Sequence, residues 1–367
     1  MKTVAFAVED GTLQLVWPAL PAGDHTVTVA DRTTTVVGDG GPLATVIDGL
    51  PAHTALEVFV DGNWATTVAT VAAPPGEELF RFATLGDIHV GDGHTFGILP
   101  TISDPGGEED SPVLRSLRAA LTELTAWGAE LVVVKGDVTH HGIAEEWELA
   151  AELLNVPGLP VIATRGNHDV CAGHVDGTPI LTAAGIELAA GGIAVRDVPG
   201  LRIIVADVTL PGRHPGSIRR VGPDILDAAA DAPGPVLLAT HHQLQRLPFP
   251  THWPPGVLGP GSGRFLRALR RANPSTFVTS GHTHRHRARR IGPLLLTEVG
   301  SPKDHPGTWA GYAVHEGGIR QVVRRVMQPE VLRWTEDTKR ALFGIWGKWS
   351  PGSLEDRCLT HPWPRGA

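Results

Sequence analysis

The spacing of apolar residues along the chain changes near residue 75. Before that point, apolar and polar positions alternate in short segments, at residues 12–17, 25–29, 55–60 and 64–71. Turn residues such as Asp61-Gly62-Asn63 separate these segments. A period of two residues is that of a half-buried strand, so we expect a small antiparallel β-sandwich domain over residues 1–75.

A different pattern follows the turn-rich linker Pro74-Pro75-Gly76-Glu77-Glu78. Apolar runs typical of strands buried in a parallel sheet lie at residues 79–85, 131–134, 161–163, 203–206, 236–239 and 277–279. Helical spacing occurs at residues 143–154 and at 112–128, where Ser111 and Pro112 supply an N-cap and a first-turn proline. This alternation predicts an α/β domain over residues 76–326, closed by strands at 294–296 and 318–326.

Residues 327–367 form a third segment, for which we expect a helical extension. It contains Trp334, Trp346, Trp349 and Trp363, and so many large apolar rings are not expected to remain in water. They would pack either on the α/β domain or on a second subunit. A homo-oligomer formed through this extension, or through the N-terminal domain, is therefore one expectation.

Composition narrows the classes of protein to be considered. The 367 residues suffice for about two domains. The two cysteines, Cys171 and Cys358, are expected to be reduced thiols. The formal net charge of -8 makes a nucleic-acid polymer an unfavourable partner. The apolar run at residues 4–8 is too short for a signal peptide or a membrane span, so we expect a cytoplasmic protein with no membrane partner.

Polar residues suited to chemistry follow the predicted strands directly. Five strand ends carry the motifs Gly86-Asp87-Ile88-His89, Gly136-Asp137, Gly166-Asn167-His168-Asp169, His241-His242 and Gly281-His282-Thr283-His284. Ligands of open α/β sheets bind at the carboxyl ends of the strands. We therefore expect the five motifs to converge on one site.

The residue types in these motifs indicate a metal centre. Aspartate, asparagine and histidine offer oxygen and imidazole donors without any thiolate, a set that suits Mn, Fe, Zn or Co. Seven candidate ligands are too many for one ion with an open position and about right for two. Two neighbouring cations repel each other, so a carboxylate is needed between them. We expect Asp137 to be this bridge rather than Asp87, because Asp137 lies midway in the order of the motifs.

These motifs, in this order, resemble those of the calcineurin-like metallophosphoesterases over about residues 80–326. The Gly-Asn-His-Asp motif and the histidine pair are most similar to the bacterial branch that hydrolyses cyclic nucleotides and glycerophosphodiesters. The resemblance implies a four-layer α/β/β/α sandwich. In the N-terminal domain, residues 47–58 are similar to the turn-into-strand passage of fibronectin type III-like domains.

The resemblance also implies a role for each motif residue. The metal ligands would be Asp87, His89 and His284 for the first ion, Asp137 as the bridge, and Asn167, His241 and His282 for the second ion. His168 would be the catalytic acid, oriented by Asp169 or by no acidic residue at all. Asn167 and His242 would face the substrate.

The chain departs from the family's patterns at two positions. Many phosphatases of this fold carry an acidic residue three places after the bridging aspartate, and His140 stands there instead. Purple acid phosphatases add a metal-binding tyrosine. Tyr312 is the only tyrosine in the chain and lies in none of the motifs, which argues against that branch.

The expected activity is hydrolysis of a small phosphate ester, with a phosphodiester favoured. A metal-bound hydroxide would attack phosphorus in line, and His168 would protonate the leaving oxygen. A phosphomonoesterase or nucleotidase on the same site is the alternative. A non-catalytic metal-binding scaffold is less favoured, because all seven ligands are present. Loops at about residues 92–110, 170–185 and 244–262 would select the substrate, and their sequences do not identify it.

Overall fold

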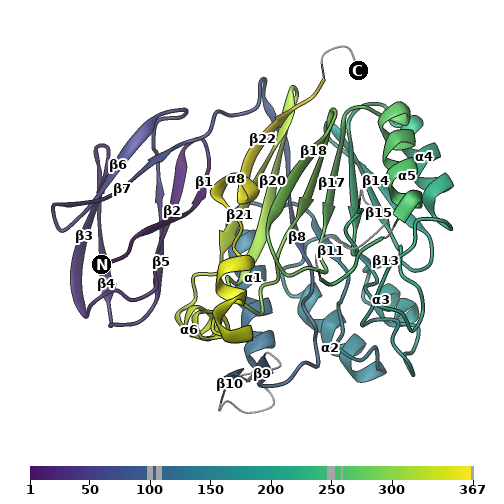
Figure 1. Ribbon diagram of the computed structural model, residues 1–367, viewed down its shortest axis with the longest axis horizontal. Coiled ribbons are helices and arrows are strands. Elements are labelled where there is room, and N and C mark those ends of the chain that lie inside the picture. Colours follow the sequence, from purple (N-terminus) through teal and green to yellow (C-terminus); the bar gives the residue numbers. More distant parts are fainter. Residues whose placement is uncertain (97–101, 105–109, 246–252, 258, 365–367) are drawn as a thin grey trace.

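The structure is a computed structural model, and it describes residues 1–96, 102–104, 110–245, 253–257 and 259–364. Figure 1 shows a smaller region built only of strands beside a larger region of strands and helices. Two of the loops expected to select the substrate, at about 92–110 and 244–262, fall partly outside the described residues.

The N-terminal region is a sandwich of two antiparallel sheets. One sheet has the order β1-β2-β5, with β1 at Val4–Val8, β2 at Thr12–Trp17 and β5 at Leu43–Asp48. The other has the order β4-β3-β6-β7, with β4 at Arg32–Gly38, β3 at Gly23–Val29, β6 at Ala55–Val60 and β7 at Asn63–Ala69. Alternate apolar residues such as Leu13 and Leu15 are buried between the sheets. These two sheets agree with the predicted sandwich, whereas its likeness to fibronectin type III domains stays a prediction.

The larger region contains two further sheets. The first has the order β13-β12-β11-β8-β20-β21-β22, with bounds Glu187–Ala189, Val161–Thr164, Val132–Lys135, Glu78–Leu85, Thr308–His315, Gly318–Arg325 and Cys358–Pro362. The second has the order β14-β15-β16-β17-β19-β18, with bounds Ile193–Val198, Leu201–Ala206, Val236–Thr240, Thr276–Ser280, Leu294–Glu298 and Arg287–Ile291. The predicted buried runs thus belong to two sheets, and most of them pair in parallel.

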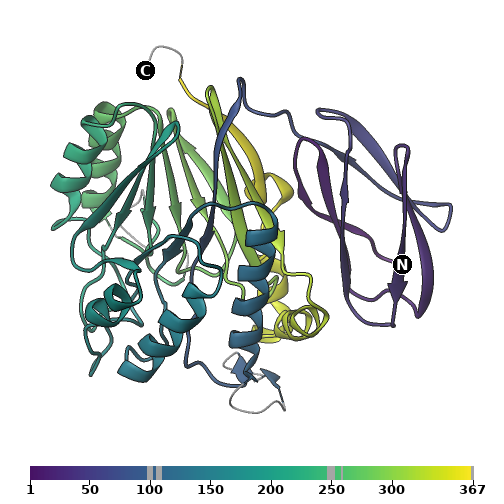
Figure 2. The same ribbon diagram turned by 180° about the vertical axis from the view of Figure 1, so that it is seen from behind.

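Helices cover the outer face of each sheet, as Figure 2 shows from behind. On the first sheet these are α1 at Pro112–Ala126, α2 at Ala144–Asn155 and α3 at Thr178–Ala183; on the second they are α4 at Gly222–Ala230 and α5 at Gly259–Ala272. The N-cap predicted at Ser111 is present, since its hydroxyl accepts a hydrogen bond from the Leu114 N–H. The expected four-layer α/β/β/α order is the one observed.

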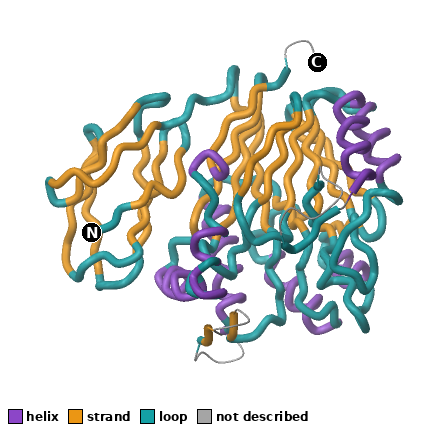
Figure 3. The backbone as a smooth tube through the Cα atoms, viewed as in Figure 1, coloured by secondary structure: helices purple, strands orange, loops and turns teal. Residues whose placement is uncertain are grey.

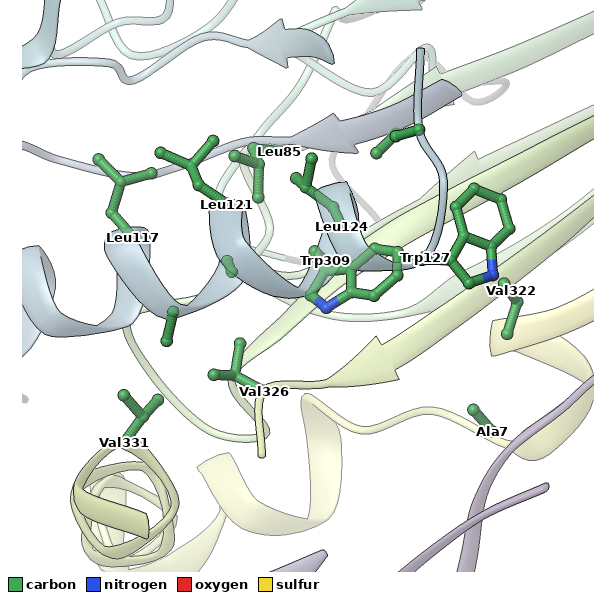
Figure 4. Packing of buried hydrophobic residues seen from close by; sticks show 14 of the residues in the cluster. Ala7, Leu85, Leu117, Leu121, Leu124, Trp127, Trp309, Val322, Val326 and Val331 are labelled. Atoms are coloured by element: carbon green, nitrogen blue, oxygen red, sulfur yellow. The ribbon is translucent and has the colours of Figure 1, made fainter. Parts of the chain in front are cut away.

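Each interface between layers has its own apolar core. Between the two sheets, Phe82 and Tyr312 stack with their ring centroids 4.8 Å apart, and Phe277 packs edge-on against Tyr312. Under α1, the apolar stripe of Leu117, Leu121 and Leu124 faces the first sheet (Figure 4). A short hairpin, β9 at Thr95–Phe96 and β10 at Ile102–Ser103, precedes α1.

The C-terminal extension packs on its own chain. It forms α6 at Pro329–Thr338, the 3₁₀ turn η2 at Leu342–Gly344, α7 at Trp346–Trp349 and α8 at Leu354–Arg357. The extension is helical, as expected, up to Arg357, and it ends in a strand that the sequence did not indicate: β22 pairs with β21 and lengthens the first sheet. A free edge strand leaves backbone groups unpaired, and pairing satisfies them better than a further helix would.

Polar contacts attach the N-terminal sandwich to the larger region. The Glu9 carboxylate pairs with Arg320 and Arg324 of β21, and the Gln14 side chain exchanges two hydrogen bonds with the Arg325 backbone. Because both ends of these contacts are largely buried, they fix the orientation of the sandwich. Both cysteines are free thiols, as expected. None of the helices in the described ranges combines the length and apolarity that a membrane span requires.

Candidate metal centre

The five sequence motifs come together where the two sheets end. Three of them follow β8, β11 and β12 of the first sheet, and two follow β16 and β17 of the second. Figure 3 shows the loops concentrated below the strands of the larger region. Potential metal-binding atoms of Asp87, His89, Asp137, His241, His282 and His284 form overlapping clusters there. Asn167 joins them, since its Oδ1 lies 3.2 Å from His241 Nε2.

The backbone at the predicted ligands is unusual. Positive φ angles, between 46° and 69°, occur at Asp87, His89, Asp137, His282 and His284. Left-handed backbone costs a residue with a side chain roughly 1–2 kcal/mol, and such strain concentrates at functional sites. The loops therefore fix the directions of these side chains at the expense of local stability.

Two glycines allow the loops to approach so closely. Gly136 has a φ of 78°, and a Cβ atom there would lie 2.7 Å from the Cβ of His241. A Cβ atom at Gly166 would lie 2.2 Å from Asp137 Oδ1. Neither position tolerates a side chain without displacing a predicted ligand.

Asp87, His89 and His284 form what we call the first half-site. Nε2 of His284 lies 3.4 Å from Asp87 Oδ1, while its Nδ1 lies 2.5 Å from Asp304 Oδ2. Nε2 of His89 is buried and has no hydrogen-bond partner among the described residues. Its other ring nitrogen, Nδ1, lies 3.4 Å from His140 Nδ1. Each imidazole thus presents Nε2 to the cluster, while Nδ1 faces a neighbouring side chain.

Asn167, His241 and His282 form the second half-site. Nδ1 of His241 donates to the Lys135 carbonyl at 2.8 Å. In the neutral ring, Nε2 then carries a free lone pair. Nε2 of His282 lies 3.3 Å from the Pro255 carbonyl and donates to it, which leaves Nδ1 as a lone pair. These two lone pairs face each other at 3.1 Å.

The Asp137 carboxylate lies between the half-sites. Its Oδ2 is 3.6 Å from His89 Nε2 and 3.3 Å from His241 Nε2. Its Oδ1 accepts a hydrogen bond from the backbone N–H of His168 at 2.9 Å. One oxygen is therefore anchored to the backbone, and the other is directed at both half-sites.

The donor set fits bound cations. When both rings are neutral, the lone pairs of His241 and His282 and the Asn167 oxygen converge in the second half-site with no proton among them. Lone pairs at about 3 Å repel each other unless a positive charge lies between them. The rear nitrogens of His241, His282 and His284 are tied to carbonyl or carboxylate oxygens, as is usual for metal-binding histidines.

The electrostatics of the site also favour positive charge. Burial opposes ionisation of Asp137, but the neighbouring histidines, above all His241, outweigh it and hold the pKa of Asp137 well below its ordinary value. Burial likewise disfavours charge on His241, yet Asp137 and Asp87 raise its pKa to about 9. The carboxylates thus stabilise a cation at this position, whether it is a proton or a metal.

His168 lies beside the first half-site. Its ring is 4.5 Å from that of His89, centroid to centroid, and its Nδ1 lies 2.9 Å from the His140 carbonyl. Because a carbonyl only accepts, Nδ1 carries the proton of that bond and Nε2 is the remaining nitrogen. The group that orients His168 is therefore the backbone of His140.

The prediction that Asp169 orients His168 is wrong. The Asp169 carboxylate accepts hydrogen bonds from the N–H groups of Val138, Thr139 and Gly166 and from the Thr139 hydroxyl. Burial, together with the charge of Asp137, raises the pKa of Asp169 to about 6 despite these bonds. Asp169 ties the Asp137 loop to the Asn167 loop and is a positioning residue.

The prediction that His242 contacts the substrate is also corrected. Its side chain is 0% exposed, and its Nε2 donates to the His214 carbonyl at 2.7 Å. Burial and the neighbouring His241 lower the pKa of His242 to about 3, so the ring is neutral. It packs against His282 within the second half-site. Asn167, the other residue expected to face the substrate, is 7% exposed.

Sequence reasoning missed Asp304 and the carbonyls of Lys135 and Pro255. Asp304 lies in the loop after β19, in none of the motifs, and backbone carbonyls leave no mark in a sequence. Tyr312 lies away from the donors, and its hydroxyl bonds to Thr279 and Gln321 between the sheets.

Comparisons with known proteins found similar sequences and structures. A probable cyclic nucleotide phosphodiesterase of Psychrobacter arcticus is 21% identical over 229 residues, which cover 60% of this chain and 79% of that protein. A purple acid phosphatase from yellow lupin (Lupinus luteus) seeds aligns with 89% of this chain and 73% of its own, at 11% identity and a TM-score of 0.49. The GAP50 anchor of the Plasmodium inner membrane complex aligns with 70% of this chain and 87% of its own, at 13% identity and a TM-score of 0.48.

The family comparison covers every predicted ligand. The sequence profile of the calcineurin-like phosphoesterases matches residues 80–286, more than half of the chain. This range begins in β8, ahead of Asp87, and ends just after His284. The chain belongs to the calcineurin-like phosphoesterase family.

Proposed function

We propose that this protein is a binuclear metal-dependent phosphodiesterase. The position of Asp137 carries the proposal, because a single carboxylate oxygen lies within 3.6 Å of one imidazole nitrogen from each half-site. A carboxylate shared in this way reduces the repulsion between two neighbouring cations. Asp87, His89 and His284 would hold one ion, and Asn167, His241 and His282 the other.

Two bound cations would supply an activated water and neutralise the charge of the phosphoryl oxygens. The remaining work falls to side chains of this protein. His168 is fixed by its bond to the His140 carbonyl, so its Nε2 is the atom that can hold a proton and give it to the departing oxygen. No serine or cysteine nucleophile is needed in this scheme.

The charges around the site support a diester over a monoester. A monoester dianion carries an additional negative charge, which usually requires a further cationic partner. The arginines next to the motifs are already paired, Arg165 with Asp207 at 2.7 Å and Arg285 with Glu298 at 3.1 Å. The printed activity of the Psychrobacter relative, a probable cyclic nucleotide phosphodiesterase, also agrees with a diester substrate.

Purified protein loaded with Mn²⁺ tests this function. Hydrolysis of bis(p-nitrophenyl) phosphate is compared with that of p-nitrophenyl phosphate and of 2′,3′- and 3′,5′-cyclic nucleotides. We expect turnover of a diester that a chelator abolishes and added Mn²⁺ restores. A tenfold or greater preference for the monoester would favour the phosphomonoesterase alternative, and metal binding without any turnover would favour the non-catalytic scaffold.

We also propose domain limits. Residues 1–75 form the N-terminal sandwich, residues 76–326 the phosphoesterase domain and residues 327–367 the C-terminal extension. The gap between β7, which ends at Ala69, and β8, which begins at Glu78, supports the first limit. Limited proteolysis with mass spectrometry tests it, since cleavage between these strands should release two protected fragments.

A further inference from the structure

The loop Lys303–His305 lies between the metal cluster and the C-terminal extension. On one side, the extension forms a hydrogen bond with each of the three residues of this loop. The Trp334 indole N–H donates to the Lys303 carbonyl at 2.6 Å, and the Trp346 indole N–H donates to Asp304 Oδ1 at 3.3 Å. The His305 N–H donates to the Thr338 hydroxyl at 2.8 Å.

On its other side the same loop holds a predicted metal ligand. Asp304 Oδ2 lies 2.5 Å from His284 Nδ1, and the Asp304 side chain is 0% exposed. A carboxylate behind an imidazole fixes the orientation of the ring and increases the basicity of the nitrogen that faces a metal. The two oxygens of Asp304 therefore connect Trp346 to His284.

We propose that the C-terminal extension is part of the metal centre, and that Trp346 and Asp304 are positioning residues for His284. This inference rests on the proposed function only in taking His284 as a metal ligand. It also accounts for Trp334 and Trp346 of the extension, because an indole combines a large apolar surface with one directed N–H donor. Phenylalanine in place of Trp334 or Trp346 would keep most of the packing and lose the hydrogen bond.

The neighbouring Trp349 provides a matched control. It lies on the same short helix, α7, with its ring 5.3 Å from that of Trp346. Its ring stacks on the Arg285 guanidinium at 4.7 Å, and no bond links it to Asp304. Trp349→Phe therefore changes the same kind of residue on the same helix without interrupting the connection to His284.

The experiment measures Mn²⁺ binding to the full-length apoprotein by isothermal titration calorimetry. Asp304→Asn should weaken one of two sites by about 10–100-fold, the usual range for losing a partner of a metal-binding histidine. Trp346→Phe should weaken the same site by less, about threefold to tenfold, because it removes only the bond to Asp304 and a phenyl ring can keep the edge-on contact of Trp346 with the His284 ring. Trp349→Phe should bind Mn²⁺ as the wild type does.

Two further readouts separate positioning from general damage. The melting temperatures of apo Trp346→Phe and apo Trp349→Phe should agree, and the visible absorption of the Co²⁺-loaded protein should change only in Trp346→Phe and Asp304→Asn. If Asp304→Asn does not fold, Trp346→Phe decides. Equal Mn²⁺ affinity in Trp346→Phe and wild type would overturn the inference. A wild type that binds no Mn²⁺ would instead overturn the proposed function.

Discussion

The two half-sites hold their histidines in different ways. In the second half-site, the rear nitrogens of His241 and His282 bond to the backbone carbonyls of Lys135 and Pro255. In the first, His284 bonds to the Asp304 side chain, and His89 lies against the side chain of His140. One half-site is oriented by the main chain and the other by replaceable side chains.

This difference determines how each half-site responds to substitution. A carbonyl stays in place whatever side chain its residue carries, so the second half-site depends mainly on the path of the backbone. The first half-site depends on Asp304, and through it on the C-terminal extension. Its metal affinity can therefore be altered by changes far from the motifs, whereas that of the second cannot be altered so easily.

The largest effect should come from the one residue that both half-sites share. Asp137→Ala removes the carboxylate between them, so the metal content should fall from about two ions per chain to well below one, and activity by about 10³-fold or more. Inductively coupled plasma mass spectrometry and diester turnover measure the two effects. Asp224→Ala, an exposed site on α4, is the control. Retention of one tightly bound ion would contradict the bridging role.

Substitution of His168 should not change metal binding at either half-site, because His168 is proposed to be a proton donor and not a metal ligand. His168→Ala should retain both ions while kcat falls by roughly 10²–10⁴-fold, the usual loss for a general acid. The loss should be smaller for p-nitrophenyl esters, whose leaving group needs little protonation, than for alkyl esters. An equal loss for both kinds of ester would argue against a role in protonation.

The convergence of the five motifs could be predicted well, because each motif follows an apolar strand of regular pattern. Sequence reasoning missed strands of weaker pattern, such as β14, whereas the charged run at residues 285–290, expected to be a strand or hairpin, does contain β18. The two-sheet arrangement came only from family resemblance. β4 and β5 in the sandwich were also missed, since runs of threonine and mixed burial blur the period of two.

In the candidate site, too, some residues could be predicted from the sequence and others could not. The convergence of the candidate ligands could be predicted, since strand ends converge. Their supporting groups could not, because the Asp304 carboxylate reaches His284 across 20 positions and no spacing rule links them. Asp169 and His242 were misassigned for a related reason. Proximity to a motif does not show whether a side chain faces the substrate or the protein interior.

The loop that supports the first half-site should also make stability depend on pH. Burial and the nearby Arg325 lower the pKa of His305 from 6.5 to about 4 in the folded state. The unfolded chain therefore binds this proton first as the pH falls. The contribution is fully present above about pH 7 and lost between about pH 6.5 and 4, on the order of 3 kcal/mol in total.

Urea denaturation at several pH values between about 7 and 4 measures this effect, by comparing wild type with His305→Gln. The variant cannot titrate at this position, so its free energy of unfolding should fall less steeply over the same range. His53→Gln is the control, since that histidine is exposed on the sandwich. Parallel curves for His305→Gln and wild type would show that His305 does not titrate as inferred.

The smallest expected effect concerns a feature that the half-sites share. Of the described arginines, the two directly next to the motifs are engaged, Arg165 by Asp207 and Arg285 by Glu298, so neither of these two is free to meet the extra charge of a monoester. We expect kcat/KM for bis(p-nitrophenyl) phosphate to exceed that for p-nitrophenyl phosphate by about tenfold, because an unpaired phosphate oxygen is costly in a desolvated site. Arg165→Gln should leave this ratio unchanged, since the guanidinium serves Asp207. If Arg165→Gln loses monoester turnover, the ratio of diester to monoester kcat/KM would rise sharply. Such a rise would show that Arg165 contacts the substrate. The two half-sites would then differ in charge as well as in the groups that orient their histidines.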